Sequence, residues 1–236
     1  MAIAGAYAGS NCAWVSTVSE TGIENGPIIQ QRDGAHLTVI INRSEKANSL
    51  TTEMLLILRD IFRKALDDDS LRSMMITGSG GRVFCAGADL NTLHDQQGGA
   101  DPWQEMSDAL RSIPILTIAA INGPCIGGGL TLALGCDIRI GVFEAHFAYP
   151  VLKNNVQPGQ YDVDRLQALI GPGRSAAMLL GGEVVSATDA VAWGLVDRLT
   201  PRDNLQETCR SLSETALAAD AAHLKKLKSM LKGGRP

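Results

Sequence analysis

The sequence predicts an α/β protein, because strand-like and helix-like hydrophobic patterns alternate along most of its 236 residues. Its organising stretch is residues 121–137, INGPCIGGGLTLALGCD, where an apolar run passes through a Gly-rich turn into a helical pattern. Such a turn leaves backbone N–H groups free at a helix N-terminus, where negative charge is stabilised. Apolar residues make up 45% of the chain, which is enough for one large core.

Turn residues and hydrophobic periodicity place the elements in order. Asp33-Gly34 is a hairpin signal between two apolar segments. The acidic run at 67–70 is interpreted as a solvated turn that ends the first helix. The expected elements are strands at 28–31 and 37–41, a helix from 51 or 52 to 67, a strand at 73–77, a helix at 102–111, strands at 115–121, 137–142 and 146–148, helices at 162–170, 173–181 and 187–193, a strand at 195–199, and two helices between 204 and 231.

Three regions are expected along the chain. Residues 1–27 are small, polar and punctuated by glycine, and they lack the basic start and apolar centre of a secretory signal. We therefore predict a flexible N-terminal extension at 1–27, a folded core at 28–200 and a short C-terminal helical region at 201–236. The polar, glycine-containing segment 91–101 is predicted to be a mobile loop.

Charge and cysteine content exclude several classes of protein. The formal net charge is −4 with both signs interspersed, so we expect no nucleic-acid partner. No apolar run approaches the roughly 18 residues that span a bilayer, so no membrane partner is expected. The five cysteines include no Cys-x-x-Cys, and the four histidines lie far apart. This predicts a cytoplasmic protein with reduced thiols and no metal site.

The glycines at 78–81 do not form a nucleotide-binding motif. Gly78 and Gly80 are followed by Val83 where a dinucleotide fingerprint has its third glycine, and no helical pattern begins there. The Gly-Lys-Ser/Thr sequence of a phosphate-binding P-loop is absent.

Two motifs together carry a family resemblance. FCAGADL at 84–90 and NGPCIGGGLTLALGCDIRI at 122–140 resemble the paired signatures of the crotonase, or enoyl-CoA hydratase/isomerase, family. The resemblance extends over about residues 28–201. It implies a spiral of ββα repeats with a C-terminal helical region, assembled as a homotrimer or a dimer of trimers. It also implies a lyase or isomerase of fatty acid metabolism, with a coenzyme A thioester as substrate and no bound cofactor.

The resemblance further implies an oxyanion hole made by the backbone N–H groups of Ala88 and Gly128. Two convergent amides stabilise a thioester enolate without reorganising, and losing one such donor costs on the order of 10²–10³ in rate. The backbone at 44–47 and at Ala86 is expected to hold the adenine and pantetheine, and Asp89 is expected to be structural. The implied substrate-binding residues are Ser44, Lys46, Ala47, Ala86, Asp89, Leu90, Thr131, Tyr149 and Val151.

The chain departs from the family's hydratase pattern at the catalytic carboxylates. Family hydratases use two glutamates, and here Thr131 and Val151 stand at the matching positions. Other members carry an aspartate eight residues further on, where this chain has Gly159. Proton-transfer groups are worth about 10²–10⁴ in rate each. Isomerisation or other enolate chemistry, including a retro-Claisen step, hydrolysis or decarboxylation, is therefore expected in preference to ordinary hydration.

Several residues compete to replace the missing carboxylates. Asp162 is the candidate catalytic residue, although a helix N-cap is the favoured structural interpretation of that position. Asp164 is expected in the first helical turn, complementing the dipole. Tyr149 is expected as a pocket wall and His94 as a solvated loop residue, while Tyr161 flanks the same segment.

Two further interpretations remain open at this stage. The missing carboxylates also fit a catalytically degenerate acyl-CoA-binding protein or structural subunit, and RNA binding is disfavoured by the net charge. Near the C-terminus, Lys225, Lys226 and Lys228 either meet CoA phosphates or form a solvated amphipathic face.

Overall fold

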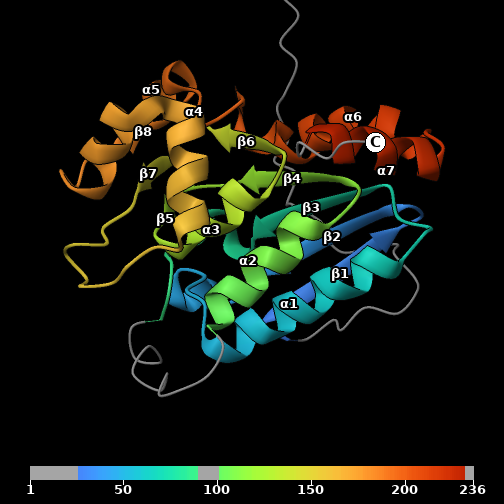
Figure 1. Ribbon diagram of the computed structural model, residues 1–236, viewed down its shortest axis with the longest axis horizontal. Coiled ribbons are helices and arrows are strands. Elements are labelled where there is room, and N and C mark those ends of the chain that lie inside the picture. The colour runs from blue at the N-terminus through green and yellow to red at the C-terminus, as the bar shows by residue number, and fades with distance from the viewer. Residues whose placement is uncertain (1–25, 90–100, 232–236) are drawn as a thin grey trace, which may run out of the picture.

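A six-stranded sheet forms the centre of the fold (Figure 1). The computed structural model describes residues 26–89 and 101–231. The neighbouring strands of the sheet are β1 (Ile28–Asp33), β2 (His36–Ile41), β3 (Ser73–Gly78), β4 (Leu116–Ile121), β6 (Ile138–Val142) and β9 (Arg198–Thr200). β1 runs antiparallel to β2, and every other neighbouring pair is parallel. The central strands read as continuous apolar runs because helices cover both faces.

A smaller sheet lies beside the large one. Its strands are β5 (Cys125–Ile126), β7 (His146–Ala148) and β8 (Val185–Ser186). A bridge between Cys85 and Cys125 adds one more segment to this row. Pairs of strands are repeatedly followed by a helix, as in β1–β2–α1, β4–β5–α3 and β6–β7–α4. The predicted α/β fold of ββα repeats with a C-terminal helical region is confirmed.

Helices lie on both sides of the large sheet. They are α1 (Thr52–Asp67), α2 (Pro102–Ser112), α3 (Gly128–Gly135), α4 (Gln160–Leu179), α5 (Ala187–Trp193), α6 (Leu205–Leu217) and α7 (Ala221–Leu231). The side chain of Thr51 caps α1 by accepting a hydrogen bond from the Met54 N–H. Figure 1 shows α1 and α2 on one side of the sheet and α6 and α7 on the other. Within the described ranges, no helix is long and apolar enough to cross a membrane.

The last strand differs from the prediction, whereas the break between two of the helices does not. The strand expected at 195–199 forms at Arg198–Thr200 instead. The N–H groups of Leu195 and Val196 bond to the Ala190 carbonyl and close the end of α5, while their side chains are buried in the core. Their apolar character therefore reflects core packing, not strand pairing. The break expected between the helices at 162–170 and 173–181 is confirmed, because α4 is interrupted at Gly171, whose φ of 80° and ψ of 165° are not helical.

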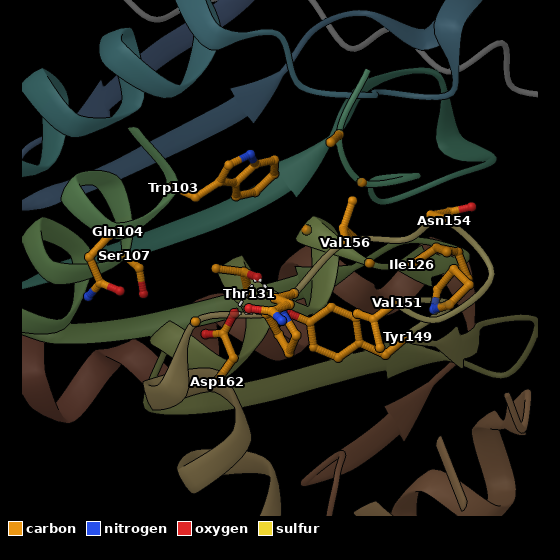
Figure 2. Close-up of a pocket in the computed structure, with 18 of the residues that line it drawn as sticks. Trp103, Gln104, Ser107, Ile126, Thr131, Tyr149, Val151, Asn154, Val156 and Asp162 are labelled. Atoms are coloured by element: carbon orange, nitrogen blue, oxygen red, sulfur yellow. Dashed lines mark hydrogen bonds between the residues drawn. The ribbon is translucent and has the colours of Figure 1, made fainter. Parts of the chain in front are cut away.

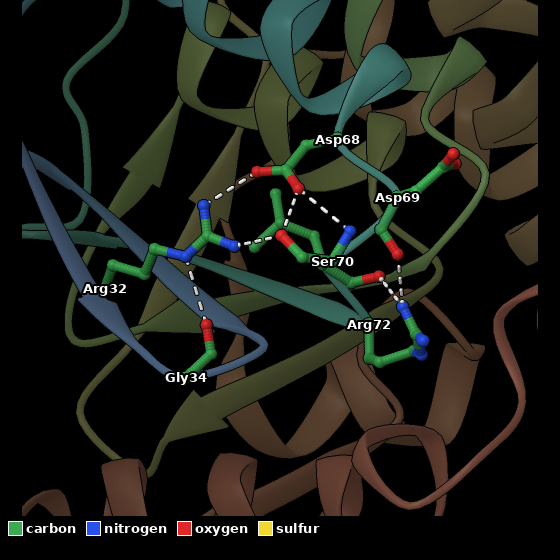
Figure 3. Close-up of polar contacts among 7 residues, drawn as sticks. Arg32, Gly34, Asp68, Asp69, Ser70 and Arg72 are labelled. Atoms are coloured by element: carbon green, nitrogen blue, oxygen red, sulfur yellow. Dashed lines mark hydrogen bonds and ion pairs between the residues drawn. The ribbon is translucent and has the colours of Figure 1, made fainter.

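The acidic run after α1 is not a simple solvated turn. Arg32 of β1 pairs with Asp68 at 2.7 Å and also donates to the Gly34 carbonyl at 3.0 Å (Figure 3). The hydrogen bond from Arg32 is the main reason that the pKa of Asp68 falls to about 2. The expectation of a solvated turn was wrong for Asp68, which ties the end of α1 to the β1–β2 hairpin.

One lysine of α7, Lys228, differs from both interpretations, whereas Lys226 is exposed as expected of a solvated face. Lys228 is buried, and its ammonium donates to the Ile115 carbonyl at 2.6 Å and pairs with Asp137. Lys225 pairs with Asp69. Lys228 therefore neither lies on a solvated face nor reaches out toward a phosphate, because it anchors α7 to the residues that immediately precede β4 and β6.

Candidate functional site

A cavity of about 400 Å³ opens between α2, α3 and the N-terminal end of α4 (Figure 2). The segment after β3 and the loop after β7 complete its walls. The lining residues used below are Ala88, Trp103, Ser107, Gly128, Thr131, Tyr149, Val151, Tyr161 and Asp162.

Ala88 and Gly128, the two residues expected to supply backbone amides, both line this cavity. The Leu50 N–H donates to the Gly87 carbonyl and the Asp89 N–H donates to the Leu50 carbonyl, both at 2.8 Å. This parallel bridge turns the N–H of Ala88 away from Leu50. Gly128 is the first residue of α3, where an N–H has no partner within its own helix. Among the described residues, neither N–H has an acceptor.

Glycine permits this close approach of the two segments. Gly87 has a φ of 96°, and a Cβ at this position would lie 3.1 Å from the Gly128 nitrogen. Only a residue without a side chain fits both the positive φ and the narrow gap. The N–H of Gly127 donates to the Ala148 carbonyl at 2.9 Å, which fixes the start of α3 against β7. The spacing of the Ala88 and Gly128 amides is therefore built by strand pairing on both sides.

Trp103 lies directly against the second of these glycines. A Cβ on Gly128 would come within 2.1 Å of the Trp103 ring, so the indole occupies the space that a side chain would need. Asp101 caps α2 by accepting from the Trp103 N–H at 3.0 Å, which fixes the first turn of that helix. Trp103 forms the wall of the cavity beside the Gly128 amide.

A buried network of three hydroxyl and carboxyl groups lies deeper in the cavity (Figure 2). The Thr131 hydroxyl donates to Asp162 Oδ2 at 2.6 Å, and the Tyr149 hydroxyl donates to the same oxygen at 2.8 Å. The two hydroxyl oxygens are 3.0 Å apart. Thr131 comes from α3, Tyr149 follows β7 and Asp162 lies in the first turn of α4. The network joins three elements that are well separated along the chain.

Burial controls the protonation of this network. Desolvation is the largest influence on Asp162 and raises the pKa of its carboxyl, while the hydrogen bonds from Thr131 and Tyr149 oppose that rise. Desolvation, followed by the nearby Asp162 charge, raises the pKa of Tyr149 well above its ordinary value. Tyr149 is thus a hydroxyl donor at neutral pH, and Asp162 is a carboxyl whose ionisation moves to higher pH.

The structure corrects the favoured interpretation of Asp162. The N-cap of α4 is Gly159, and Asp162 lies three residues into the helix with its side chain buried in the cavity. Asp164 lies beyond the first turn, contrary to expectation, and accepts a hydrogen bond from Gln160. Tyr161 lines the cavity as well, with the Arg111 guanidinium stacked 3.4 Å from the centre of its ring. A carboxylate therefore lies beside Thr131, although it comes from another part of the sequence.

The remaining predicted residues fall in different places. Val151 lines the cavity as an apolar wall, and Ala86 lines its edge. The Ala86 N–H donates to the Ala47 carbonyl at 3.0 Å, while Ser44 and Lys46 are exposed on the short helix beside them. Asp89 pairs with Arg43 at 2.7 Å, which holds the same loop in place. Leu90 and His94 lie outside the described residues, as do the proposed mobile loop up to residue 100 and residues 1–25 of the expected N-terminal extension.

Sequence reasoning missed two residues of the cavity. Trp103 and Ser107 are four residues apart on α2, so they share one helical face. Their spacing on an amphipathic helix was a signal for a common surface, but it did not show that this surface faces the Gly-rich turn.

Comparisons with known proteins agree with one another. The sequence model described as Enoyl-CoA hydratase/isomerase matches residues 32–234. The chain is 36% identical over 174 residues to "Probable enoyl-CoA hydratase echA6" of Mycobacterium leprae, covering 72% of this chain and 70% of that protein. Among solved structures it is similar to Pseudomonas aeruginosa DspI, with a TM-score of 0.84, 28% identity, and coverage of 92% of this chain and 90% of that one. A "monofunctional enoyl CoA isomerase from M.smegmatis" gives a TM-score of 0.76 at 29% identity, with coverage of 87% and 92% respectively.

Proposed function

This chain belongs to the enoyl-CoA hydratase/isomerase family, and on that basis we propose that it is an enzyme that binds an acyl-CoA thioester and stabilises its enolate. The names of its relatives include both a hydratase and an isomerase. Family membership therefore gives the class of substrate, and the choice of reaction has to be argued from the groups that line the cavity.

The proposed oxyanion hole consists of the N–H groups of Ala88 and Gly128. Both belong to the cavity wall, and neither donates to another described residue. A thioester oxygen that accepts from both amides acquires negative charge when the α-proton leaves. The amides and the N-terminal dipole of α3 are already oriented toward that charge, so they stabilise the enolate without rearranging.

Asp162 is the proposed base, and the network around it is the observation that carries the proposal. Thr131 and Tyr149 both donate to Oδ2, which leaves Oδ1 without a protein partner among the described residues. Oδ1 takes the α-proton of the bound thioester, and the two hydroxyls hold the carboxylate in position while its charge changes. Because the pKa of Asp162 is raised by desolvation, the carboxylate is a stronger base than an exposed aspartate.

This arrangement favours isomerisation or related enolate chemistry over ordinary hydration. Hydration needs one group to activate water and another to protonate the α-carbon. The described lining holds two carboxyls, but Asp101 accepts from the Trp103 N–H as the cap of α2, so Asp162 is the carboxyl of the buried network, and Val151 presents an apolar surface. A single carboxyl that removes a proton at one carbon and returns it at another moves a double bond without a second acid.

A second candidate function is an acyl-CoA-binding protein with little turnover. The observation in its favour is that Thr131 and Val151 stand where the resemblance implies two carboxylates. The Asp162 network argues against this alternative, because burying a carboxyl costs free energy that a binding wall would not require.

The test measures turnover and α-proton exchange for a panel of enoyl-, 3-enoyl-, 3-hydroxy- and 3-oxoacyl-CoA thioesters. The Gly128 N–H is probed in a Trp103→Ala background, because any side chain at 128 clashes with the indole. Gly128→Ala keeps the N–H and Gly128→Pro removes it, while proline remains compatible with the first position of a helix. We expect the proline variant to be at least 100-fold slower than the alanine variant. Equal rates in the proline and alanine variants would refute the proposed oxyanion hole. Binding of the thioesters without turnover or α-proton exchange would favour the acyl-CoA-binding protein.

A further inference from the structure

Ser107 is an exception among the buried helical serines of the described chain. Its side chain is only 5% exposed, yet its hydroxyl has no hydrogen-bond partner within the described chain. Ser112, Ser175 and Ser213 each donate to the carbonyl four residues earlier in their helices. Ser107 lines the cavity instead of bonding to its own helix. A buried hydroxyl without a partner is costly, so this position favours a ligand or water that completes it.

The packing of α2 on α3 sets the depth of Ser107 in the cavity. Trp103 lies against Gly128, and Leu110 lies against Gly135, where a Cβ would come within 2.6 Å of the leucine. Both pairs are separated by 25 residues, so the two helices run side by side in the same direction. Ser107 is then about 6 Å beyond Trp103 along α2, and Thr131 is about 4.5 Å beyond Gly128 along α3. Ser107 is thus one turn below the two amides, close to the level of Thr131.

Four segments therefore present polar groups at one depth. Ser107 projects from α2, and the Thr131–Tyr149–Asp162 network comes from α3, the residue after β7 and α4 (Figure 2). The described lining includes two acidic residues, Asp101 and Asp162, and no lysine or arginine. An anionic group would be repelled there, whereas an uncharged oxygen can both donate to and accept from a serine hydroxyl.

We propose that Ser107 is a specificity-determining residue. Its hydroxyl binds an uncharged oxygen that lies about one helical turn deeper in the cavity than the thioester carbonyl. This inference rests on the proposed function, because it assumes that the carbonyl lies between the Ala88 and Gly128 amides. The oxygen is either a hydroxyl or ketone of the acyl group itself or a bound water. The first source makes the substrate an oxygenated, uncharged acyl-CoA, distinguished from a plain alkyl or a carboxyacyl thioester.

Paired ligands test this assignment. Butyryl-CoA, 3-hydroxybutyryl-CoA and malonyl-CoA are titrated by calorimetry into the wild type, Ser107→Ala and Ser112→Ala. Ser112 is the matched control, because it is on the same helix but is exposed and bonded to Asp108. We expect the wild type and the control to prefer the hydroxyacyl over the butyryl thioester by roughly 3- to 10-fold, as one neutral hydrogen bond allows. Ser107→Ala should lose that preference, and malonyl-CoA should bind most weakly to all three.

A second measurement separates the two sources of the oxygen. If Ser107→Ala leaves the binding preference unchanged but slows α-proton exchange of butyryl-CoA at least threefold, the subsite holds water. If neither the preference nor the rate changes, the subsite is refuted. Failure of the wild type to bind any of the thioesters would overturn the proposed function as well. Thermal melting provides a structural check, because a serine with a purely structural role would destabilise the fold when truncated, whereas removal of an unpaired hydroxyl should not.

Discussion

Replacing Asp162 by asparagine tests the proposed mechanism most directly. Asparagine has nearly the same shape, and its carbonyl oxygen can still accept from Thr131 at 2.6 Å and Tyr149 at 2.8 Å. The change therefore preserves the buried network and removes only the ability to take a proton. General acid–base groups contribute about 10²–10⁴ in rate, so we expect α-proton exchange to slow by that factor. Binding of the thioester should change much less.

The assay follows incorporation of deuterium from D₂O into a bound acyl-CoA by mass spectrometry, over a range of pH. The raised pKa of Asp162 predicts that the wild-type rate climbs with pH above the ordinary titration range of an aspartate. The exchange rate of the asparagine variant should not show this increase with pH. Asp164→Asn is the matched control, because Asp164 is on the same helix, is exposed and accepts a hydrogen bond from the Gln160 side chain. An Asp162→Asn variant that exchanges within threefold of the wild type would refute the assignment of the base.

Three further predictions concern stability. Gly128→Ala should lower the free energy of unfolding by about 1–3 kcal/mol in urea titrations, because the added Cβ meets the Trp103 ring. In a Trp103→Ala background the same substitution should cost much less. An equal cost in both backgrounds would contradict the contact between Gly128 and Trp103. Asp89→Asn should lower the free energy of unfolding by about 1.5–3 kcal/mol, since it weakens the charge-assisted hydrogen bond to Arg43. An unchanged midpoint of urea unfolding would refute a structural role for the Arg43–Asp89 pair. Because burial raises the folded-state pKa of Asp162, the wild type should lose stability as pH rises from about 4 through that pKa, whereas Asp162→Asn should not. The difference between their melting temperatures should therefore grow with pH across this window and then level off, and a constant difference would show that Asp162 titrates normally.

Local chemistry in the sequence was enough to predict the α/β class and most element positions. Thr51 begins α1, and Gly171 with Pro172 breaks α4, because capping and backbone restrictions act within a few residues. The last strand was misplaced because Leu195 and Val196 are buried at the end of α5, where their N–H groups bond to the Ala190 carbonyl. Apolar character by itself does not distinguish burial at a helix end from burial in a paired strand. The Gly-rich turn and the Ala88 segment were also recognisable, because each motif is continuous along the chain.

What the sequence by itself determined is thus the family, the fold and the two backbone segments whose amides flank the cavity. Tertiary structure alone decided that Asp162 lies beside Thr131, that Trp103 covers Gly128, and that Lys228 is buried against Asp137. The physical reason is that each of these contacts joins segments 25 or more residues apart. Their meeting depends on the register between packed helices and on the route of the loops, and neither is encoded in the spacing of residues along one element.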